Sequence, residues 1–400
     1  MQNLLFLAHR IPYPPNKGDK IRSYHFLKYL TAHFNVHLGT FIDDPHDWQY
    51  TAKLDTICAS THYLGLNPLL SKIKSVQGLL TGEALSVPYY RNQAMQVWVD
   101  GTLKKHNIKK VLIFSSVMAD FIKKPDDLDM IVDFVDVDSD KWQQYAASKT
   151  GLAAWIYQRE SRYLLNYEKQ VARQSRVSFF VSEQEAELFK QLAPEVSPKV
   201  THINNGVDID YFSPELVFTS PYPDNVQVIV FTGAMDYWAN IDAVVWFAKD
   251  VFEPIAKRHP SVKFYIVGSR PGKEVTALAN DSVIVTGSVD DVRPYVAHAR
   301  LAVAPLRIAR GIQNKVLEAM AMGKPVVATT AAMEGIPYDE SLAVSVSDEP
   351  DVMLSQLNAL LQHDASLVFQ NNRDFVTDKF SWEQNVNRLV TLMQTEHTLN

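Results

Sequence analysis

The chain has 400 residues, a length that suits two or three domains with a sizeable hydrophobic core. Hydrophobic residues make up 46% of it and charged residues 21%, which excludes collagen-like, mucin-like and disordered chains. The net charge of −6 argues against general nucleic-acid binding, which needs a basic face. The single cysteine, Cys58, excludes an internal disulfide and is expected to be a buried structural thiol in a reducing compartment.

The N-terminal apolar run is short and no basic residue precedes it, so it does not have the form of a signal peptide. No stretch of the sequence approaches 18 consecutive apolar residues, so no membrane-spanning helix is expected. We therefore expect a cytoplasmic protein, with peripheral contact with the inner face of the plasma membrane as an open alternative.

Short runs of Val, Ile, Leu and Phe alternate with longer amphipathic segments in the first half of the chain. The runs show little alternation of apolar and polar residues, as in strands that are covered on both faces. The expected strands are 3–8, 36–41, 62–66, 110–114, 130–134, 177–181 and 200–203, and the expected helices are 19–34, 89–106, 139–173 and 183–192. This alternation favours a doubly wound parallel sheet.

The same pattern restarts after a polar, proline-containing stretch at 204–223. The expected strands are now 227–232, 263–267, 283–286, 301–304, 325–328 and 342–346, with helices at 240–257, 290–298, 312–322, 350–363 and 381–395. The sequence thus predicts an α/β protein with two Rossmann-like, doubly wound parallel-sheet domains that face each other across a cleft. The predicted first domain is 1–203, with a helix at about 380–400 that crosses back to it, and the predicted second domain is 204–379.

The most informative stretch is 301–327, which reads as strand, loop, helix, glycine stop and a further strand. Gly311 lies just before the helix, where free N–H groups and the helix dipole favour an anion. Lys315 and Glu318 lie three residues apart on one face of that helix. A positive helix start suits a diphosphate, and a carboxylate one turn later suits the hydroxyls of a ribose. A solvated surface Lys–Glu pair is the alternative interpretation.

This stretch resembles the donor-binding motif of family 4 retaining glycosyltransferases, whose architecture is the GT-B fold of two Rossmann-like domains. In that family a glutamate, seven residues and a second glutamate frame the loop and helix. Here Glu318 occupies the second position and Arg310 the first. The resemblance implies that Glu318 holds the donor ribose. We expect Arg310 to be catalytic and to stabilise the departing diphosphate together with Arg307, Lys315 and the amides at Gly311.

Further stretches are similar to the same family. Residues 203–214 resemble its inter-domain segment, and residues 231–240 resemble its first loop of the second domain, where Gly233 is a predicted donor contact. Residues 9–23 and 133–142 resemble a subgroup of sugar transferases from exopolysaccharide and exosortase (PEP-CTERM) loci. The resemblance implies transfer of a hexosyl unit from a nucleoside-diphosphate sugar to a glycan acceptor, which we expect to be lipid-linked, in exopolysaccharide biosynthesis. It also implies retention of configuration without a metal.

The first domain supplies three further candidates. Gly18 lies between the first strand and a helix, where a residue without Cβ lets the donor phosphates approach the backbone. Arg22 lies in the first turn of that helix, an unfavourable place for a cation, so it is a predicted donor contact, with a solvated arginine as the alternative. Asp138 is the predicted catalytic carboxylate, which would orient or deprotonate the acceptor hydroxyl. The spacing of Asp136 and Asp138 also matches a divalent-metal motif, but we expect no metal, and no G-x-G-x-x-G motif indicates a dinucleotide cofactor.

Two other segments leave their interpretations open. Apolar residues at helical spacing in 66–80, beside Lys72 and Lys74, suit either a membrane surface or a helix packed on its own sheet. Aromatic residues in 142–163 suit either an acceptor wall or a core.

Two alternative functions also stay open. One is a nucleotide-sugar 2-epimerase, which would act without an acceptor. The other is a non-catalytic sugar-nucleotide-binding component of a polysaccharide assembly complex, an idea that Arg310 in place of the family's glutamate supports.

Overall fold

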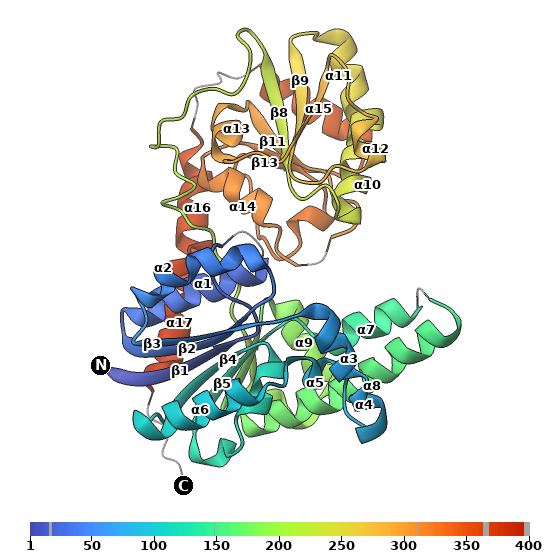
Figure 1. The fold of residues 1–400 in the computed structure, drawn as a ribbon. Coiled ribbons are helices and arrows are strands. Elements are labelled where there is room, and N and C mark those ends of the chain that lie inside the picture. The colour runs from blue at the N-terminus through green and yellow to red at the C-terminus, as the bar shows by residue number, and fades with distance from the viewer. Residues whose placement is uncertain (16–17, 148, 310, 363–367, 396–400) are drawn as a thin grey trace. The chain divides into compact units, whose positions relative to one another are not determined.

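A computed structural model describes residues 1–15, 18–147, 149–309, 311–362 and 368–395. The chain divides into two compact units (Figure 1). The first unit comprises Met1–Asn205 and Asn385–Asn400, and the second comprises Gly206–Gln384. Over the described part of the chain, none of the helices combines the length and the apolar character that crossing a bilayer requires.

The described strands of the first unit form a seven-stranded sheet in the order β3-β2-β1-β4-β5-β6-β7. Every neighbouring pair in it is parallel. The strands are β1 (Gln2–Ala8), β2 (Phe34–Ile42), β3 (Ser60–Gly65), β4 (Lys110–Phe114), β5 (Asp129–Val135), β6 (Val177–Phe180) and β7 (Val200–His202). The order reverses direction between β1 and β4, so the connections from these two strands leave the sheet on opposite sides.

Helices cover both faces of this sheet (Figure 1). Phe26 of α1 packs against Phe114 on one face, and Met95 of α6, Val171 of α8 and Phe189 of α9 pack against the other. Because both faces are covered, the strands carry apolar residues in succession. The helices are α1 (Gly18–Thr31), α2 (Thr51–Asp55), α3 (Pro68–Ser75), α4 (Gln77–Thr81), α5 (Ser86–Tyr90), α6 (Gln93–Lys105), α7 (Asp138–Ala147), α8 (Gly151–Gln174) and α9 (Glu183–Leu192), with the greater part of α17 (Trp382–Gln394).

The second unit repeats the plan with a six-stranded parallel sheet among its described residues, in the order β10-β9-β8-β11-β12-β13. Its strands are β8 (Gln227–Thr232), β9 (Val262–Val267), β10 (Val283–Gly287), β11 (Leu301–Ala304), β12 (Val326–Ala328) and β13 (Val344–Val346). Its helices are α10 (Trp238–Trp246), α11 (Glu253–Arg258), α12 (Lys273–Thr276), α13 (Arg293–His298), α14 (Asn314–Ala321), α15 (Pro350–Leu361) and α16 (Gln370–Phe380). The order again reverses between neighbouring strands, here β8 and β11.

Three predicted helices are interrupted, each for a local reason. The helix expected at 139–173 is α7 and α8, and α8 begins at Gly151 with a φ of 64°, a conformation that breaks a continuous helix. The helix expected at 89–106 is α5 and α6, because Asn92 accepts the first amides of α6. The helix expected at 240–257 contains a π-helical segment, Phe247–Phe252, just before Pro254, which has no N–H to continue the α-helical pattern.

A tight backbone contact inside the second unit joins residues that are distant in sequence. Val207 donates to the carbonyl of Phe380 at 2.7 Å and pairs with Ser381 in an isolated parallel bridge. A Cβ on Gly206 would lie 2.7 Å from the backbone nitrogen of Trp382 and 2.8 Å from its Cα. Only a residue without a side chain therefore fits at position 206.

We expect Gly206→Ala to lower the free energy of unfolding of the second unit by about 1–3 kcal/mol, because backbone atoms would have to move apart. Gly101→Ala is the matched control, since a Cβ at Gly101, inside α6, meets no atom within 4 Å. The control should raise the free energy of unfolding by about 0.4–1 kcal/mol, because alanine allows the unfolded chain fewer conformations than glycine does. Urea unfolding followed by tryptophan fluorescence measures both. Equal stability of the two variants would contradict the packing argument.

Candidate functional site

The pairing of β8 with β9, next to the strand reversal in the second sheet, brings two glycine-containing loops together. Gly233 follows β8, and Gly268 follows β9. A Cβ on Gly268 would lie 1.6 Å from the carbonyl oxygen of Gly233, so the two backbones are in direct contact. Ligands of open α/β sheets bind beyond the carboxyl ends of the strands at such a reversal. These loops form the floor of a candidate site.

Lys315, one residue into α14, points at this floor. Its Nζ donates to Asn240 Oδ1 at 2.6 Å, and Asn240 Nδ2 in turn donates to the carbonyl of Ala234 at 2.9 Å. A Cβ on Gly233 would lie 3.3 Å from Lys315 Nζ. The ammonium group also lies over the ring of Phe231, 4.4 Å from its centroid. The amide of Asn240 and the absence of a side chain at Gly233 thus fix the lysine at the end of β8.

Glu318 lies one turn further along α14, and burial affects both charges. Burial lowers the pKa of Lys315 to about 8, against the opposing effect of Glu318. Burial raises the pKa of Glu318 to about 7, against the opposing effect of Lys315. Each charge only partly compensates the desolvation of the other. A bound anion at Lys315 and hydroxyl donors at Glu318 would complete that compensation.

The start of α14 also offers groups to a ligand. Gly311 has a φ of 69°, and its carbonyl accepts from the Gln313 side chain. Within the described part of the chain, Asn314 Oδ1 is buried without a hydrogen-bond partner. Arg310 lies outside the described residues, so its predicted role is not placed by the structure.

Arg307 is directed to a different side of α10 from Lys315. Its guanidinium forms an ion pair with Asp242 and lies 5.7 Å from the ring centroid of Trp246. Asp242 follows Asn240 by two residues, a spacing that places the two side chains on different faces of a helix. The structure therefore brings Gly233, Lys315 and Glu318 together and engages Arg307 with Asp242.

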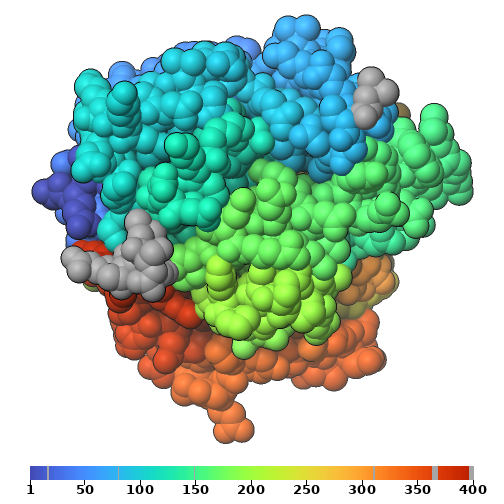
Figure 2. All heavy atoms as spheres, turned by 90° about the horizontal axis from the view of Figure 1, so that it is seen from below, coloured from blue at the N-terminus to red at the C-terminus, as the bar shows by residue number. Residues whose placement is uncertain are grey.

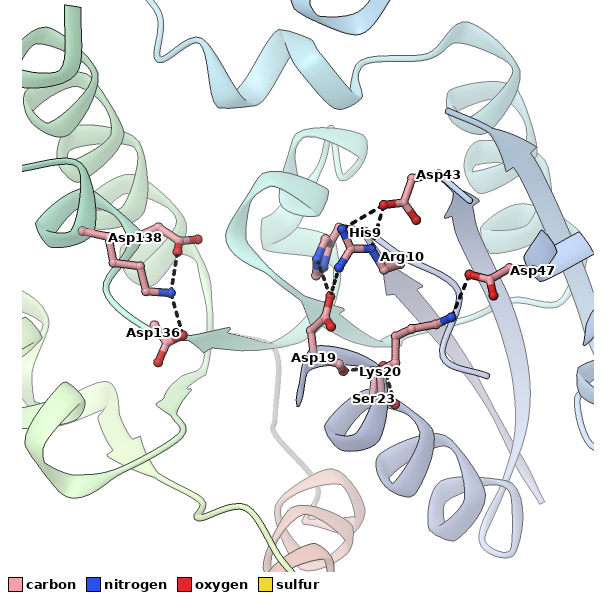
Figure 3. A network of polar contacts seen from close by, with 10 residues as sticks. His9, Arg10, Asp19, Lys20, Ser23, Asp43, Asp47, Asp136 and Asp138 are labelled. Carbon is pink, nitrogen blue, oxygen red and sulfur yellow. Dashed lines mark hydrogen bonds and ion pairs between the residues drawn. The ribbon is translucent and has the colours of Figure 1, made fainter. Parts of the chain in front are cut away.

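The first sheet has a polar cluster at the carboxyl ends of β1 and β2 (Figure 3). Arg10 bridges two carboxylates, at 2.5 Å to Asp19 and 2.8 Å to Asp43. His9 Nε2 lies 3.5 Å from Asp19, and its Nδ1 is buried without a partner among the described residues. Although burial opposes it, the hydrogen bond with His9 and the charge of Arg10 hold the pKa of Asp19 well below its usual range.

Asp138 lies at the start of α7, next to the end of β5 (Figure 3). Lys141 Nζ bridges it to Asp136, at 3.2 Å and 2.6 Å, and the two carboxylates raise the pKa of Lys141 against the effect of burial. Two buried carboxylates hold the loop itself, because Glu185 accepts from the amide of Val137 and Glu168 from the amide of Ser139. Asp138 is therefore presented on a fixed turn with its side chain partly exposed.

Arg22 is buried within the first unit. Its Nε lies 2.7 Å from Asp133, its Nη1 donates to Asn205, and its guanidinium lies over the ring of Phe26. Its contacts tie α1 to the end of β5. Burial raises the pKa of Asp133 although the Arg22 charge opposes this shift. Gly18 begins α1 at an exposed position, where a Cβ would meet no atom within 4 Å.

Two of the residues that complete these sites, Asn240 and Lys141, were not identified from the sequence. The loop at 231–240 carries no Arg or Lys, and an amide that positions a lysine 75 residues away leaves no local signal. Lys141 is three residues from Asp138 on a helix, a spacing that does indicate an ion pair.

Metal ligands and a reactive thiol are further groups that could add chemistry to such sites. Among the described residues, no group of three or more His, Cys, Asp or Glu side chains is arranged to hold a metal ion. Burial, with a smaller contribution from Asp55, raises the pKa of the Cys58 thiol to about 12, so it is not a thiolate at neutral pH.

Comparison with known proteins finds one matching domain family and several solved structures of similar fold. Residues 226–363 match the family described as Glycosyl transferases group 1. No curated protein gave a significant match to the chain. Similar solved structures include sucrose-phosphate synthase from Thermosynechococcus elongatus, with a TM-score of 0.66 and 17% identity over 98% of both chains. A glycosyltransferase from Rickettsia africae ESF-5 gives a TM-score of 0.65 and 14% identity over 98% of both chains.

A third similar structure is Anabaena Alr3699/HepE in complex with UDP and glucose. It has a TM-score of 0.64 and 14% identity, over 99% of this chain and 100% of that one. These structures cover both units, and each unit has the Rossmann strand order. The predicted fold class, a GT-B chain of two Rossmann-like domains, is confirmed.

We expect Asp133→Leu to destabilise the first unit by about 3–5 kcal/mol, because it leaves the buried Arg22 guanidinium without its counter-ion. The double variant Arg22→Met/Asp133→Leu should regain most of that loss, since it removes both charges from the core. Chemical unfolding of the wild type, both single variants and the double variant gives the coupling energy. A double variant as unstable as the sum of the singles would show that the two side chains act independently.

Proposed function

We propose that the chain is a glycosyltransferase of the family 4 type. In this proposal it transfers a hexosyl unit from a nucleoside-diphosphate sugar to a lipid-linked glycan acceptor in exopolysaccharide biosynthesis. The reaction retains the anomeric configuration and uses neither a metal nor a cofactor besides the sugar nucleotide. The proposed setting is the cytoplasm, with peripheral contact with the inner face of the plasma membrane.

The arrangement of Lys315, Asn240 and Gly233 carries this proposal. A diphosphate at the end of β8 would receive the Lys315 ammonium and free amides at the start of α14. Glu318, one turn along, would accept the two hydroxyls of the ribose. The match of residues 226–363 to Glycosyl transferases group 1 supports the same assignment, and so does the UDP complex of the Anabaena protein.

Charge stabilisation of the leaving group is the chemistry that these residues can supply. As the bond between the sugar and the diphosphate breaks, negative charge develops on the phosphate oxygen. Lys315 is already fixed by Asn240 and partly desolvated, so it meets this charge with little reorganisation. Arg310 and Arg307 belong to the proposal as further cations. Arg307 would have to leave Asp242 to reach the diphosphate.

The first unit is proposed to bind the acceptor. Asp138 would orient or deprotonate the attacking hydroxyl from its fixed turn. Gly18 keeps its proposed role of admitting the donor phosphates. Arg22 is proposed to act on that site through the position of α1, since its guanidinium is engaged with Asp133.

Donor binding is tested by thermal unfolding in the presence of UDP, GDP, ADP, CMP and NAD, and of UDP- and GDP-sugars, with and without EDTA. A ligand at about 100 times its dissociation constant adds about 2.7 kcal/mol to stability. We expect stabilisation by one nucleoside diphosphate, independent of EDTA and lost in Glu318→Ala. Glu253→Ala, on the exposed surface of the same unit, is the control and should bind normally. Stabilisation by none of these nucleotides would contradict the proposed donor site.

The products separate the proposed transferase from the two alternatives. A 2-epimerase would convert the sugar nucleotide to its epimer without an acceptor, which NMR of the sugar detects. A non-catalytic binding component would show stabilisation but no turnover with water, lipid extract or glycan.

The ionisation of Lys315 gives a pH test of the diphosphate position. With a pKa of about 8 in the free protein, Lys315 is largely neutral at pH 8.5, and a bound diphosphate raises that pKa. Binding should therefore take up a fraction of a proton at pH 8.5. Calorimetric titration in buffers of different ionisation enthalpy measures this uptake. It should vanish in Lys315→Met and persist in Lys257→Met, whose lysine is exposed. Equal uptake in both variants would place the diphosphate elsewhere.

A further inference from the structure

Helix α3 turns an apolar face outward. Leu69, Leu70, Ile73 and Val76 recur at helical spacing, and their exposed fractions are 73%, 58%, 69% and 54%. The sequence allowed this apolar face either to pack on the sheet or to lie on a membrane surface. Because the face is exposed, packing on the sheet is wrong. Single exposed apolar residues are ordinary, whereas four on one helical face indicate a binding surface.

This face is held in place by the rest of the unit. Arg159 of α8 donates to the carbonyls of Gly78, in the first turn of α4, and of Glu83, just after that helix. The buried carboxylate of Glu160 accepts from the amides of Leu85 and Ser86, which begin the next helix. The segment from α3 to α5 is thus docked on α8 by its polar backbone, and the apolar side of α3 points away from this attachment.

The hairpin of α7 and α8 extends the same surface. Tyr145, Leu152 and Trp155 are 55%, 72% and 56% exposed. Figure 2 shows the blue segment that contains α3 and α4 beside the green segment that contains α7 and α8. A shallow pocket on the hairpin is lined by Trp155, Arg159, Arg162 and Tyr163. We call α3, α4 and this hairpin the apolar–basic surface.

Within residues 66–82 and 149–163 the exposed charges of the apolar–basic surface are basic, whereas α7 carries Asp138 and Asp140 in its first turn. Lys72, Lys74, Lys149 and Arg162 are exposed on it. In residues 66–82 and 149–163 the only acidic residue is Glu160, whose side chain is buried and bonded to the backbone. The chain as a whole carries 45 acidic and 39 basic residues, so this surface departs from the average. Apolar side chains ringed by lysine, arginine, Trp and Tyr suit the interface of an anionic bilayer.

We propose that the apolar–basic surface seats the first unit on an anionic lipid bilayer. Leu69, Leu70, Ile73 and Leu152 would enter the region between headgroups and acyl chains. The lysines would meet the lipid phosphates, and Trp155 and Tyr145 would lie at headgroup level. The biological purpose of this contact rests on the proposed function, because a lipid-linked acceptor is held at the same bilayer surface.

Co-sedimentation of the full chain with vesicles tests the proposal without donor or acceptor. We expect binding to phosphatidylcholine vesicles that contain 30% phosphatidylglycerol, and weak binding to pure phosphatidylcholine. Lys72→Gln/Lys74→Gln should weaken binding about thirtyfold, from the loss of two cationic contacts. Leu70→Ser/Ile73→Ser should weaken it at least about tenfold. High salt should release the protein in part, because it screens the lysines.

Matched controls lie on α6 of the same unit. Lys104→Gln/Lys105→Gln and Val97→Ser change exposed residues of the same types and should bind vesicles like the wild type. The proposal is overturned if the wild type binds no vesicles, or if the α3 and α6 variants bind equally. It is also overturned if the lipid-free wild type is a dimer that Leu70→Ser/Ile73→Ser converts to a monomer. Nucleotide binding measured on the same samples keeps the proposed donor site a separate question.

Discussion

Parallel pairing of the strands constrains where chemistry can occur in this molecule. In a parallel sheet every strand ends at the same edge, so the loops that follow neighbouring strands meet there. The reversal of strand order between β8 and β11 opens a space at that edge of the second sheet. The close contact of Gly233 with Gly268 sets its floor, and α14, which follows β11, supplies the charges. The order of the strands therefore determines where the proposed donor site lies, and the local sequence determines which side chains it contains.

Two sets of opposite charges, Arg22 with Asp133 and Lys315 with Glu318, lie in surroundings that partly exclude water. Arg22 and Asp133 contact each other at 2.7 Å, Arg22 also donates to Asn205 Oδ1, and Asp133 accepts from the backbone amide of Val135. Lys315 donates to Asn240, and burial shifts the pKa of both Lys315 and Glu318 toward their neutral forms, as it does for Asp133. Arg22 and Asp133 join α1 to the end of β5, whereas Lys315 lies beside Gly233 at the end of β8. This difference in position favours α14 over α1 as the binding element.

The strands were predictable from sequence because runs of Val, Ile, Leu and Phe that are covered on both faces leave a local signal. The interruptions of the helices were harder to predict from sequence, since they depend on a positive φ at Gly151 and on a π-helical turn before Pro254. Of the site, Lys315 and Glu318 were predicted from the stretch 301–327, and Gly233 from the separate stretch 231–240. The contact of Asn240 with Lys315 could not be predicted from the sequence, because it forms only when β8 and β11 are neighbours in the folded sheet. The outward face of α3 could not be predicted either, because helical spacing does not say which partner covers it.

The two sheet edges differ in charge, and this difference bears on how substrates would be sorted. At the first edge the described carboxylates Asp19, Asp43, Asp136 and Asp138 face the cations Arg10 and Lys141, so negative charge is in excess. Such an edge offers acceptors to the hydroxyls of a neutral glycan. At the second edge Lys315 and the start of α14 favour an anion. Within the proposed function, this difference favours the second unit for the diphosphate and the first unit for the glycan, with Gly18 as the donor contact that the first unit supplies.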